Sequence, residues 1–314
     1  MTIAFLFPGQ GSQSVGMGRA LADAFAAARE VFEEVDEALK QKLSRLVWEG
    51  PESDLVLTEN AQPAIMAASL AVVRVLEREA GFEFSRRVRL AAGHSLGEFS
   101  ALAAAGSFRL ADAARLLRTR GLAMQQAVAA GEGAMSALIG IDVPDAEAAA
   151  LESAAQGGVC VVANDNAPGQ VVISGTKDAV ERGGDFAKGK GARRVIPLSV
   201  SAPFHCLLMQ PAAESVREAL AHVTIRPPAV PIVSNVTAAE VSEPDTIRRL
   251  LVEQVTSRVR WRESVLAFRS LGVDKTVEAG GNRVLTGMVK RIDGELTPVS
   301  LDTPGDIEAF VRTL

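Results

Sequence analysis

Short apolar runs alternate with longer amphipathic stretches along most of this 314-residue chain. The runs TIAFLF (2–7) and VRLAA (88–92) are each predicted to form a buried strand. Helical spacing of apolar residues marks four further stretches: 18–40, 61–80 (with Asn60 as N-cap and Pro63 in the first turn), 96–105 and 110–129. Strands that alternate with helices predict an α/β fold whose mostly parallel sheet is covered on both faces.

Residues 131–198 follow a different pattern and are predicted to form a separate, small domain. Its predicted strands are 133–141, 159–164, 169–175 and 193–198, and its predicted helices are 144–155 and 176–189. The middle two strands form a hairpin around NDNAPG. The order βαββαβ is that of a ferredoxin-like domain. Gly183 and Gly184 are unexpected inside the second helix, because glycine weakens a helix interior.

The alternation of strands and helices resumes after this insertion, so residues 1–130 and 199–314 are predicted to form one large α/β domain. Its remaining predicted strands are 230–236, 274–278 and 297–300, and its remaining predicted helices are 206–222, 244–271 with breaks, 283–291 and 304–313. Hydrophobic residues make up 48% of the chain, which suffices for a substantial core.

The composition narrows the possible classes of function. The net charge is −5, so no basic field over the whole chain indicates nucleic-acid binding. No apolar run approaches the roughly 20 residues that span a bilayer, and the amino terminus lacks the basic region of a signal peptide. Cys160 and Cys206 do not make a disulfide framework, so we expect a cytoplasmic protein.

The segment GHSLG (93–97) lies between a predicted strand and a predicted helix. Gly-x-Ser-x-Gly at such a corner is typical of a nucleophile elbow. Ser95 would then stand at a helix amino terminus, where the helix dipole favours developing negative charge. The same residues also suit a tight turn without chemistry, so the hypothesis of a nucleophile requires a base.

A base for Ser95 has to come from the three histidines of the chain. His94 adjoins the serine and is expected to point away, and His222 ends a helix at the surface. His205 lies at a second strand-end corner, where α/β folds gather catalytic groups, and is therefore the candidate base. Cys206 is expected to be buried packing. No acidic residue is marked as an orienter of the histidine, which favours a Ser–His dyad over a triad.

Arg120 falls on the apolar stripe of the predicted helix 110–129, at helical spacing from Leu116, Leu117 and Met124. A guanidinium that faces a core costs several kcal/mol unless it is paired. Its partner is either a local Asp or Glu or the carboxylate of a ligand, held by two parallel hydrogen bonds. If Arg120 lines the pocket of Ser95, the transferred acyl group should carry a free carboxylate.

Seven segments spread over essentially the whole chain form a specific series. They are PGQGSQ (8–13), GHSLGE (93–98), RGLAMQ (120–125), NDNAPGQVVISG (164–175), SAPFHCLLM (201–209), VEQVTSRVRW (252–261) and VLTGMVKRI (284–292). In this order and spacing they closely resemble the malonyl-CoA:acyl carrier protein transacylases. The resemblance implies an α/β-hydrolase-like large domain and a ferredoxin-like small one. The segment AGGNRVL (279–285) departs from the Gly-x-Gly-Lys-Val-Leu run usual in relatives.

The resemblance implies a ping-pong transfer in which Ser95 takes a malonyl group from malonyl-CoA as an ester, with His205 as its base. Arg120 would bind the malonyl carboxylate. The backbone N–H groups of Gln10 and Leu96 would form the oxyanion hole. The malonyl group then passes to the phosphopantetheine thiol of acyl carrier protein, which supplies fatty-acid synthesis. No metal and no cofactor are implied, and members of the family are usually monomers.

Further roles follow from the same resemblance. The main-chain carbonyl of Gln254 would orient His205 in place of the missing acid. Phe204 in APFH resembles the HAFH pattern of malonyl-selective domains, so a preference for malonyl over methylmalonyl is expected. The carrier protein is typically acidic, so a basic patch is expected to dock it, at KGKGARR (188–194) or at RRVR (86–89).

Two other classes of function stay open at this point. A serine hydrolase of acyl-CoA or short esters would use the same dyad, and a carrier-binding subunit would need no catalysis. Arg120 and the series of segments speak against the hydrolase, whereas Ser95 and His205 speak against a subunit without catalysis. The carrier protein could also belong to polyketide synthesis or to a malonate decarboxylase.

Overall fold

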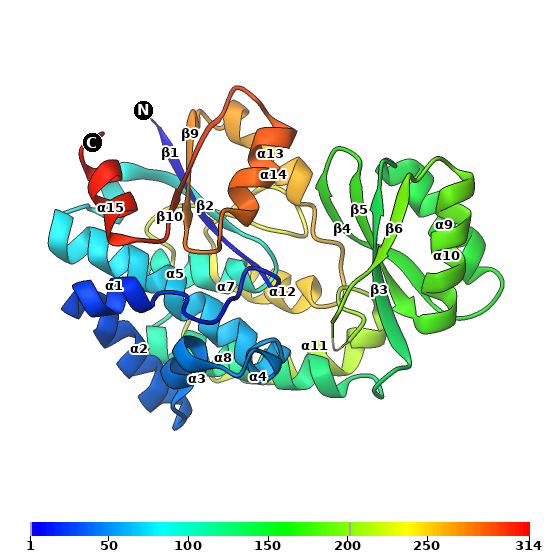
Figure 1. The fold of residues 1–314 in the computed structure, drawn as a ribbon, viewed down its shortest axis with the longest axis horizontal. Helices are drawn as coiled ribbons and strands as arrows, with labels where there is room; N and C mark the ends of the chain where they lie inside the picture. The colour runs from blue at the N-terminus through cyan, green and yellow to red at the C-terminus, as the bar shows by residue number, and fades with distance from the viewer. Residues whose placement is uncertain (1, 201) are drawn as a thin grey trace.

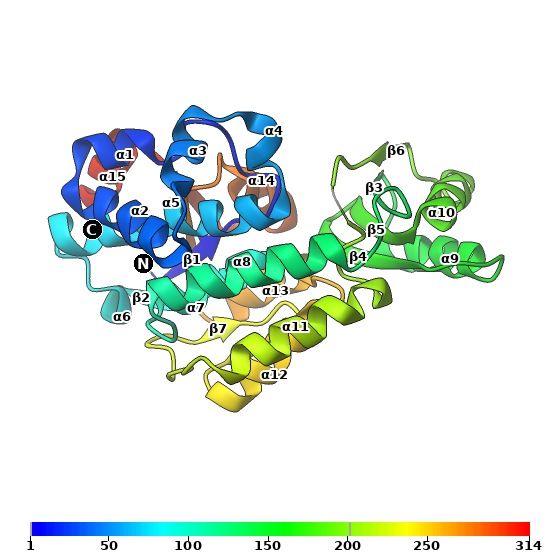
Figure 2. The same ribbon diagram turned by 90° about the horizontal axis from the view of Figure 1, so that it is seen from below.

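The chain folds around two β-sheets that lie side by side (Figures 1 and 2). The computed structural model describes residues 2–200 and 202–314, so Ser201 of the SAPFHCLLM segment lies outside the described residues. The larger sheet contains β1 (Ile3–Phe7), β2 (Val88–Gly93), β7 (Ile232–Val233), β8 (Glu240–Val241), β9 (Lys275–Ala279) and β10 (Thr297–Leu301). Its strand order is β10-β9-β1-β2-β7-β8, and all neighbours are parallel except β7 and β8. The predicted α/β fold with a mostly parallel sheet is confirmed.

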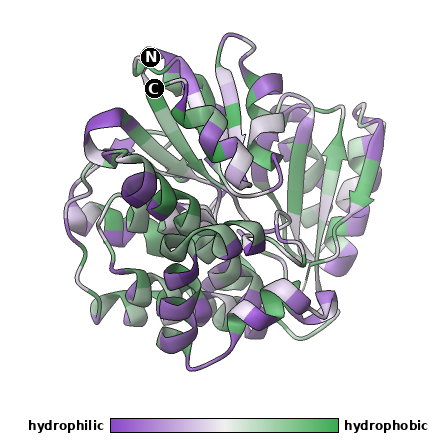
Figure 3. Cartoon of the chain, turned by 60° about the vertical axis from the view of Figure 1, so that its left-hand side comes forward, coloured by the Kyte–Doolittle hydropathy of each residue, from purple (hydrophilic) through white to green (hydrophobic). Residues whose placement is uncertain are grey.

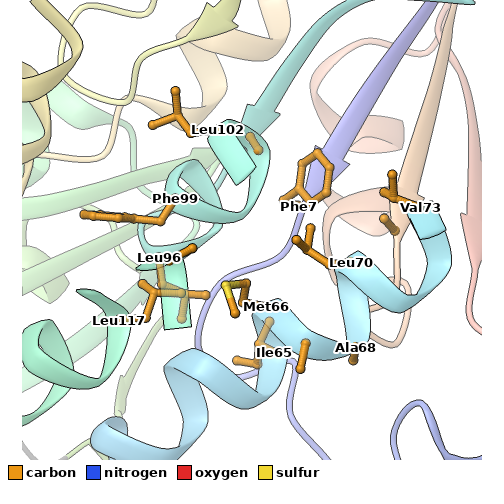
Figure 4. Close-up of a cluster of buried hydrophobic side chains, with 14 of the residues drawn as sticks. Phe7, Ile65, Met66, Ala68, Leu70, Val73, Leu96, Phe99, Leu102 and Leu117 are labelled. Carbon is orange, nitrogen blue, oxygen red and sulfur yellow. The ribbon is translucent and has the colours of Figure 1, made fainter. Parts of the chain in front are cut away.

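The central strand β1 explains why both faces of this sheet are covered. All its residues are buried, and successive side chains point to opposite faces. One face is covered by α2 (Ala26–Leu39), α5 (Thr58–Ala80), α7 (Leu96–Ala104) and α8 (Leu110–Gln126), and the other by α13 (Trp261–Ser270) and α14 (Val284–Ile292). Figure 4 shows part of the first face, where Phe7 of β1 lies beside Leu70 of α5.

The smaller sheet is antiparallel and carries its helices on one face. It consists of β3 (Gly133–Ile139), β4 (Cys160–Ala167), β5 (Gln170–Thr176) and β6 (Arg194–Pro197), in the order β4-β5-β3-β6, with α9 (Val143–Ala154) and α10 (Lys177–Gly189). The helices and the sheet enclose an apolar cluster of their own. Gly183 fits this packing, because a Cβ there would lie 2.9 Å from the sulfur of Cys160.

The predicted helices are mostly found, with differences at their ends. The stretch 18–40 is two helices, α1 (Arg19–Ala24) and α2, because Phe25 between them is extended. Helix α5 begins at Thr58, so Asn60 is not its N-cap and Pro63 lies inside the helix. Three short helices are not predicted: α3 (Leu43–Glu49), α4 (Glu52–Leu55) and α6 (Phe84–Arg87). The later helices are η1 (Leu207–Met209, a 3₁₀ turn), α11 (Gln210–Ala221), α12 (Pro244–Gln254) and α15 (Pro304–Val311).

Two strand predictions need correction. The strand predicted at 230–236 shrinks to the two residues of β7, because the chain leaves the sheet to place Asn235 against the end of β2. The hairpin predicted around NDNAPG turns only at Pro168 and Gly169, since β4 continues to Ala167. This longer strand carries two asparagines and an aspartate toward the large domain.

The seam between the two sheets is a second, shorter stretch of β pairing. The N–H of Asp165 donates to the carbonyl of Val259 (3.0 Å), and the N–H of Val259 donates to the carbonyl of Ala163 (2.8 Å). Arg262 at the start of α13 pairs with the buried carboxylate of Asp165 at 2.9 Å. In Figure 3 the strands are mostly hydrophobic, and hydrophilic residues lie on the outer turns of the helices. Within residues 2–200 and 202–314, no helix has the length and apolar character needed to cross a membrane.

Candidate active site

Ser95 stands at the sharp corner that joins β2 to α7, as the sequence predicts. Its backbone has φ 53° and ψ −110°, a conformation that non-glycine residues rarely adopt. The flanking glycines are required by contact: a Cβ on Gly97 would lie 2.1 Å from the carbonyl oxygen of Phe7. The corner therefore packs directly on the end of β1 and lifts the serine above the carboxyl edge of the sheet.

An asparagine that the sequence analysis missed holds this corner in place. The N–H of Ser95 donates to Oδ1 of Asn235 (2.7 Å), and Nδ2 of Asn235 donates to the carbonyl of Gly93 (2.7 Å). Asn235 is fully buried just beyond β7. Its only sequence signal is a polar residue at the carboxyl end of a predicted strand, where α/β folds place functional groups.

Ser95 and His205, 110 positions apart in the chain, are hydrogen-bonded. Oγ of Ser95 lies 2.8 Å from Nε2 of His205, and Nδ1 of His205 lies 2.9 Å from the carbonyl oxygen of Gln254. A proton on Nδ1 that donates to this carbonyl leaves Nε2 as the acceptor for the serine hydroxyl. Burial, reinforced by the positive charge of Arg120, lowers the pKa of His205 to about 3, so the imidazole is neutral near pH 7.

Arg120 is buried at 1% exposure and reaches the same serine. Its Nη1 donates to Oε1 of Gln62 (2.8 Å), and its Nη2 donates to Oε1 of Gln254 (2.9 Å) and to Oγ of Ser95 (3.0 Å). Burial lowers its pKa to about 10, with the carboxylate of Glu98 opposing that shift, so it remains charged near pH 7. Among the described residues its bonded partners are neutral, which favours the alternative in which it awaits the carboxylate of a ligand.

A cavity of about 320 Å³ opens above these groups, between the two sheets. The large domain contributes to its wall Gln10, His94, Ser95, Phe204, His205 and Met288, and the small domain contributes Met135, Asn164 and Asn166. The segment 198–200, which returns from the small domain, closes one side. The cavity is thus lined mainly by apolar and amide side chains, with the hydroxyl of Ser95 and the rings of His94 and His205 among them.

The backbone N–H groups of Gln10 and Leu96 are the donors that the sequence analysis expects in an oxyanion hole. Leu96 is the first residue of α7, so its N–H has no partner within the helix. Within the described part of the chain, the N–H groups of Gln10 and Leu96 make no hydrogen bond. The side chain of Gln10 is held by Thr58, whose hydroxyl donates to Oε1 at 2.7 Å. An oxyanion hole at these two N–H groups stays a prediction.

The remaining two histidines and Cys206 are not part of the hydrogen-bonded pair of Ser95 and His205. His94 makes no hydrogen bond to Ser95, but its ring lines the same cavity, where Nε2 lies 2.9 Å from Oδ1 of Asn166. Burial lowers the pKa of His94. His222 is exposed at the end of α11, as predicted. Cys206 is buried and its thiol donates to the carbonyl of Pro203, so it is packing rather than a second nucleophile.

Comparisons with known proteins agree with this arrangement. A family model described as "Acyl transferase domain" matches residues 4–292. The chain is 44% identical to the malonyl CoA-acyl carrier protein transacylase of Bacillus subtilis (strain 168), with 99% of this chain and 97% of the relative covered. It is 45% identical to the transacylase of the same name from Escherichia coli (strain K12), with 98% of each chain covered.

Solved structures extend the likeness to the whole fold. The crystal structure of an acyl-carrier-protein-S-malonyltransferase from Bartonella henselae has a TM-score of 0.97 and 52% identity, and covers 100% of this chain and 99% of its own. A structure described as a type II PKS acyl-carrier protein in complex with its malonyl-transacylase has a TM-score of 0.96 and 41% identity, with both chains covered fully.

Proposed function

This chain belongs to the acyl transferase domain family, and from that premise we propose that it transfers a malonyl group from malonyl-CoA to acyl carrier protein. The single observation that carries the proposal is the contact of Arg120 with Ser95. A buried guanidinium 3.0 Å from the nucleophile suits an acyl group that ends in a carboxylate. A hydrolase of simple esters would gain nothing from a buried charge at this place.

In the first half-reaction, Oγ of Ser95 attacks the thioester carbonyl of malonyl-CoA while Nε2 of His205 takes the hydroxyl proton. The carbonyl oxygen becomes an oxyanion, which the N–H groups of Gln10 and Leu96 stabilise. When the tetrahedral intermediate collapses, the C–S bond breaks and the protonated His205 returns its proton to the departing coenzyme A thiol. The product is a malonyl ester on the serine.

In the second half-reaction, the phosphopantetheine thiol of the carrier protein gives its proton to Nε2 of His205 and attacks the ester carbonyl. The C–O bond to Ser95 then breaks, and His205 returns the proton to the serine hydroxyl. The main-chain carbonyl of Gln254 keeps the imidazole in one orientation throughout. We propose no metal and no cofactor for either half-reaction, since the dyad, the arginine and the two N–H groups supply every step.

Finer assignments belong to the same proposal. We propose that residues 1–130 and 199–314 form an α/β-hydrolase-like domain and that 131–198 form a ferredoxin-like one, which the strand order β4-β5-β3-β6 supports. All the site residues come from one chain, in keeping with a monomer. Two buried free cysteines suit the reducing cytoplasm. We propose fatty-acid synthesis as the pathway, and the polyketide carrier in the related complex makes polyketide synthesis the second candidate.

We also propose where the carrier protein docks. In the segment 188–194, Lys188 pairs with Asp185 and Lys190 with Glu152, whereas Arg193 and Arg194 are exposed and make no ion pair within the described residues. Strand β6, which contains Arg194, leads directly into the segment 198–200 of the cavity wall. The segment 86–89 is less suitable, because it lies at the start of β2, whereas Ser95 follows the end of that strand.

Intact-protein mass spectrometry tests the proposed function. After mixing with malonyl-CoA, the protein should gain the mass of one malonyl group, and Ser95→Ala should gain none. Added carrier protein in its phosphopantetheine form should then acquire the malonyl group faster than free malonate appears. Release of malonate at an unchanged rate, without malonyl carrier protein, would instead assign a hydrolase.

A further inference from the structure

A buried glutamate that takes no part in the steps above lies directly behind the active site. Glu98 is the third residue of α7 and is 2% exposed. Glutamate at this position of a helix commonly caps the helix from the surface. The side chain of Glu98 instead turns inward, where Oε2 accepts from Nε2 of Gln254 (2.8 Å) and from the N–H of Asn235 (3.1 Å).

The amide of Gln254 has one orientation that satisfies all its neighbours. Its Oε1 accepts from Arg120, and its Nε2 donates to Glu98 and to the carbonyl of Ser95 (2.9 Å). If the amide were reversed, its N–H₂ would face the guanidinium and its oxygen would face a carboxylate and a carbonyl. Arg120, which only donates, and Oε2 of Glu98, which accepts, therefore fix this amide from opposite sides.

The fixed amide in turn locates the group that orients the base. Gln254 is the last residue of α12, and its main-chain carbonyl receives the N–H of His205. Asn235, the second group that Glu98 holds, bonds to the backbone on both sides of the serine corner. One carboxylate thus lies behind both members of the dyad, although it touches neither.

Charge and burial agree with this arrangement. Glu98 supplies the negative charge that attracts Arg120 through the intervening amide. Burial raises the pKa of Glu98 to about 7, and its hydrogen bonds from Gln254 and Asn235 partly oppose that shift. A buried carboxylate is costly unless such donors satisfy it. Ile or Leu at this position would avoid that cost but leave the two donors unpaired.

We propose that Glu98 is a positioning residue for malonyl transfer, which holds Gln254 and Asn235 and through them sets His205 and Ser95. The inference rests on the proposed function, because its effect is on the acylation of Ser95. Glu98 should matter as an acceptor of two hydrogen bonds. A glutamine in its place keeps one oxygen for both donors, whereas a methionine of similar volume offers no comparable acceptor.

The test compares Glu98→Gln and Glu98→Met by rapid-quench mass spectrometry of the malonyl-enzyme. Glu98→Met should form the malonyl-enzyme about 100-fold more slowly, the usual consequence of misplacing reacting groups by about 1 Å. Glu98→Gln should stay within about 5-fold of the unmodified protein, since its acceptor is retained. The Kd for malonyl-CoA, measured by calorimetry in a Ser95→Ala background, should change less than 3-fold in either variant.

A matched control separates positioning from general damage to the core. Asp36 in α2 is 7% exposed and accepts from the N–H (2.8 Å) and hydroxyl (2.6 Å) of Ser44, but it does not line the cavity. Asp36→Leu should lower the melting temperature and leave the acylation rate of the folded protein unchanged. If Glu98→Met also lowered only the melting temperature, Glu98 would be a structural residue and the inference would be wrong.

A double variant tests whether Glu98 acts through Gln254. Gln254→Leu removes the amide but keeps the main-chain carbonyl. If the two single substitutions acted independently, their fold-losses in the rate of malonyl-enzyme formation would multiply. The combined Glu98→Met/Gln254→Leu variant should lose clearly less than that product, because both substitutions remove the same contact. A loss of rate in the double variant equal to the product of the two single losses would overturn the inference. If the unmodified protein itself forms no malonyl ester on Ser95, the proposed function fails instead, so the two failures are distinguishable.

Discussion

The two sides of the cavity are built on different physical principles. The large-domain side contains Ser95 and His205, with Arg120 bonded to the serine from behind the wall. The N–H of Ser95 donates to the side-chain oxygen of Asn235, Arg120 donates to those of Gln62 and Gln254, and His205 donates to the main-chain carbonyl of Gln254. The small-domain side contributes Met135, Asn164 and Asn166, which are neutral. The large-domain side is fixed by many buried hydrogen bonds, whereas the other side closes the cavity with neutral side chains.

This difference follows from the two sheets. A parallel sheet brings the carboxyl ends of several strands to one edge, where helix amino termini and loops converge. Ser95 follows β2 and Asn235 follows β7 at that edge. The antiparallel sheet has no such edge, and it presents instead side chains from two strands, Met135 of β3 and Asn164 and Asn166 of β4. Changes in the two sides should therefore have effects of different kind and size.

The largest effect is expected from Arg120, on the chemical side. Arg120→Ala should lose about 2–5 kcal/mol in kcat/KM for malonyl-CoA, because the substrate carboxylate would be buried without a partner. Acetyl-CoA, which has no carboxylate, should be tolerated better than before. The control is Arg115→Ala, an exposed arginine of the same helix. If the ratio of malonyl to acetyl activity did not change, Arg120 would not be the residue that binds the malonyl carboxylate.

Phe204 should show a smaller effect on specificity. This buried ring lines the cavity next to His205, and the prediction is that it fills the space that an α-methyl group would need. Phe204→Ala should narrow the preference for malonyl-CoA over methylmalonyl-CoA by about 1–3 kcal/mol, the worth of one methyl group in a pocket. Leu207→Ala, at a side chain that is 69% exposed, serves as the control. If Phe204→Ala kept the full preference for malonyl-CoA over methylmalonyl-CoA, another residue of the cavity wall would have to determine it.

The neutral imidazole of His205 should make the free energy of unfolding depend on pH. Its pKa is about 3 when folded and near 6.5 when unfolded, so between these values only the unfolded chain takes up the proton. Stability is therefore lost as the pH falls. From pH 7.5 to 5.0 the unmodified protein should lose about 2 kcal/mol more unfolding free energy than His205→Asn. Equal losses in urea titrations of the two proteins would contradict a neutral, buried base.

The smallest effect is expected on the outer surface of the small domain. Arg193→Glu/Arg194→Glu should raise the KM for carrier protein by about 5–10-fold at low salt and leave the KM for malonyl-CoA unchanged. Added salt should shrink the difference, because the two arginines are exposed. Arg86→Glu, near the opposite end of β2, is the control. An equal rise for both substrates would place the docking surface elsewhere.

Much of the site was predictable because the chemistry is tied to local patterns. The corner at Ser95 is marked by glycines between a strand and a helix, and Arg120 by its position on an apolar stripe. Gln254 was found only through resemblance to a family, since nothing local marks a carbonyl as the orienter of a histidine. Gln62, Asn235 and the inward side chain of Glu98 were missed, because a buried amide in a helix or loop has no distinctive spacing.

The sequence by itself predicted most of the strands and the longer helices, the separate βαββαβ pattern within residues 131–198 and the residue types able to react. These depend on periodicity, turn residues and rare charged positions, which are local properties of the chain. Only the tertiary structure decided that Arg120 faces amides and a serine rather than an acid, and that β7 ends early to place Asn235. Such contacts join residues up to 142 positions apart and are set by how the sheets and helices pack, which no local pattern encodes.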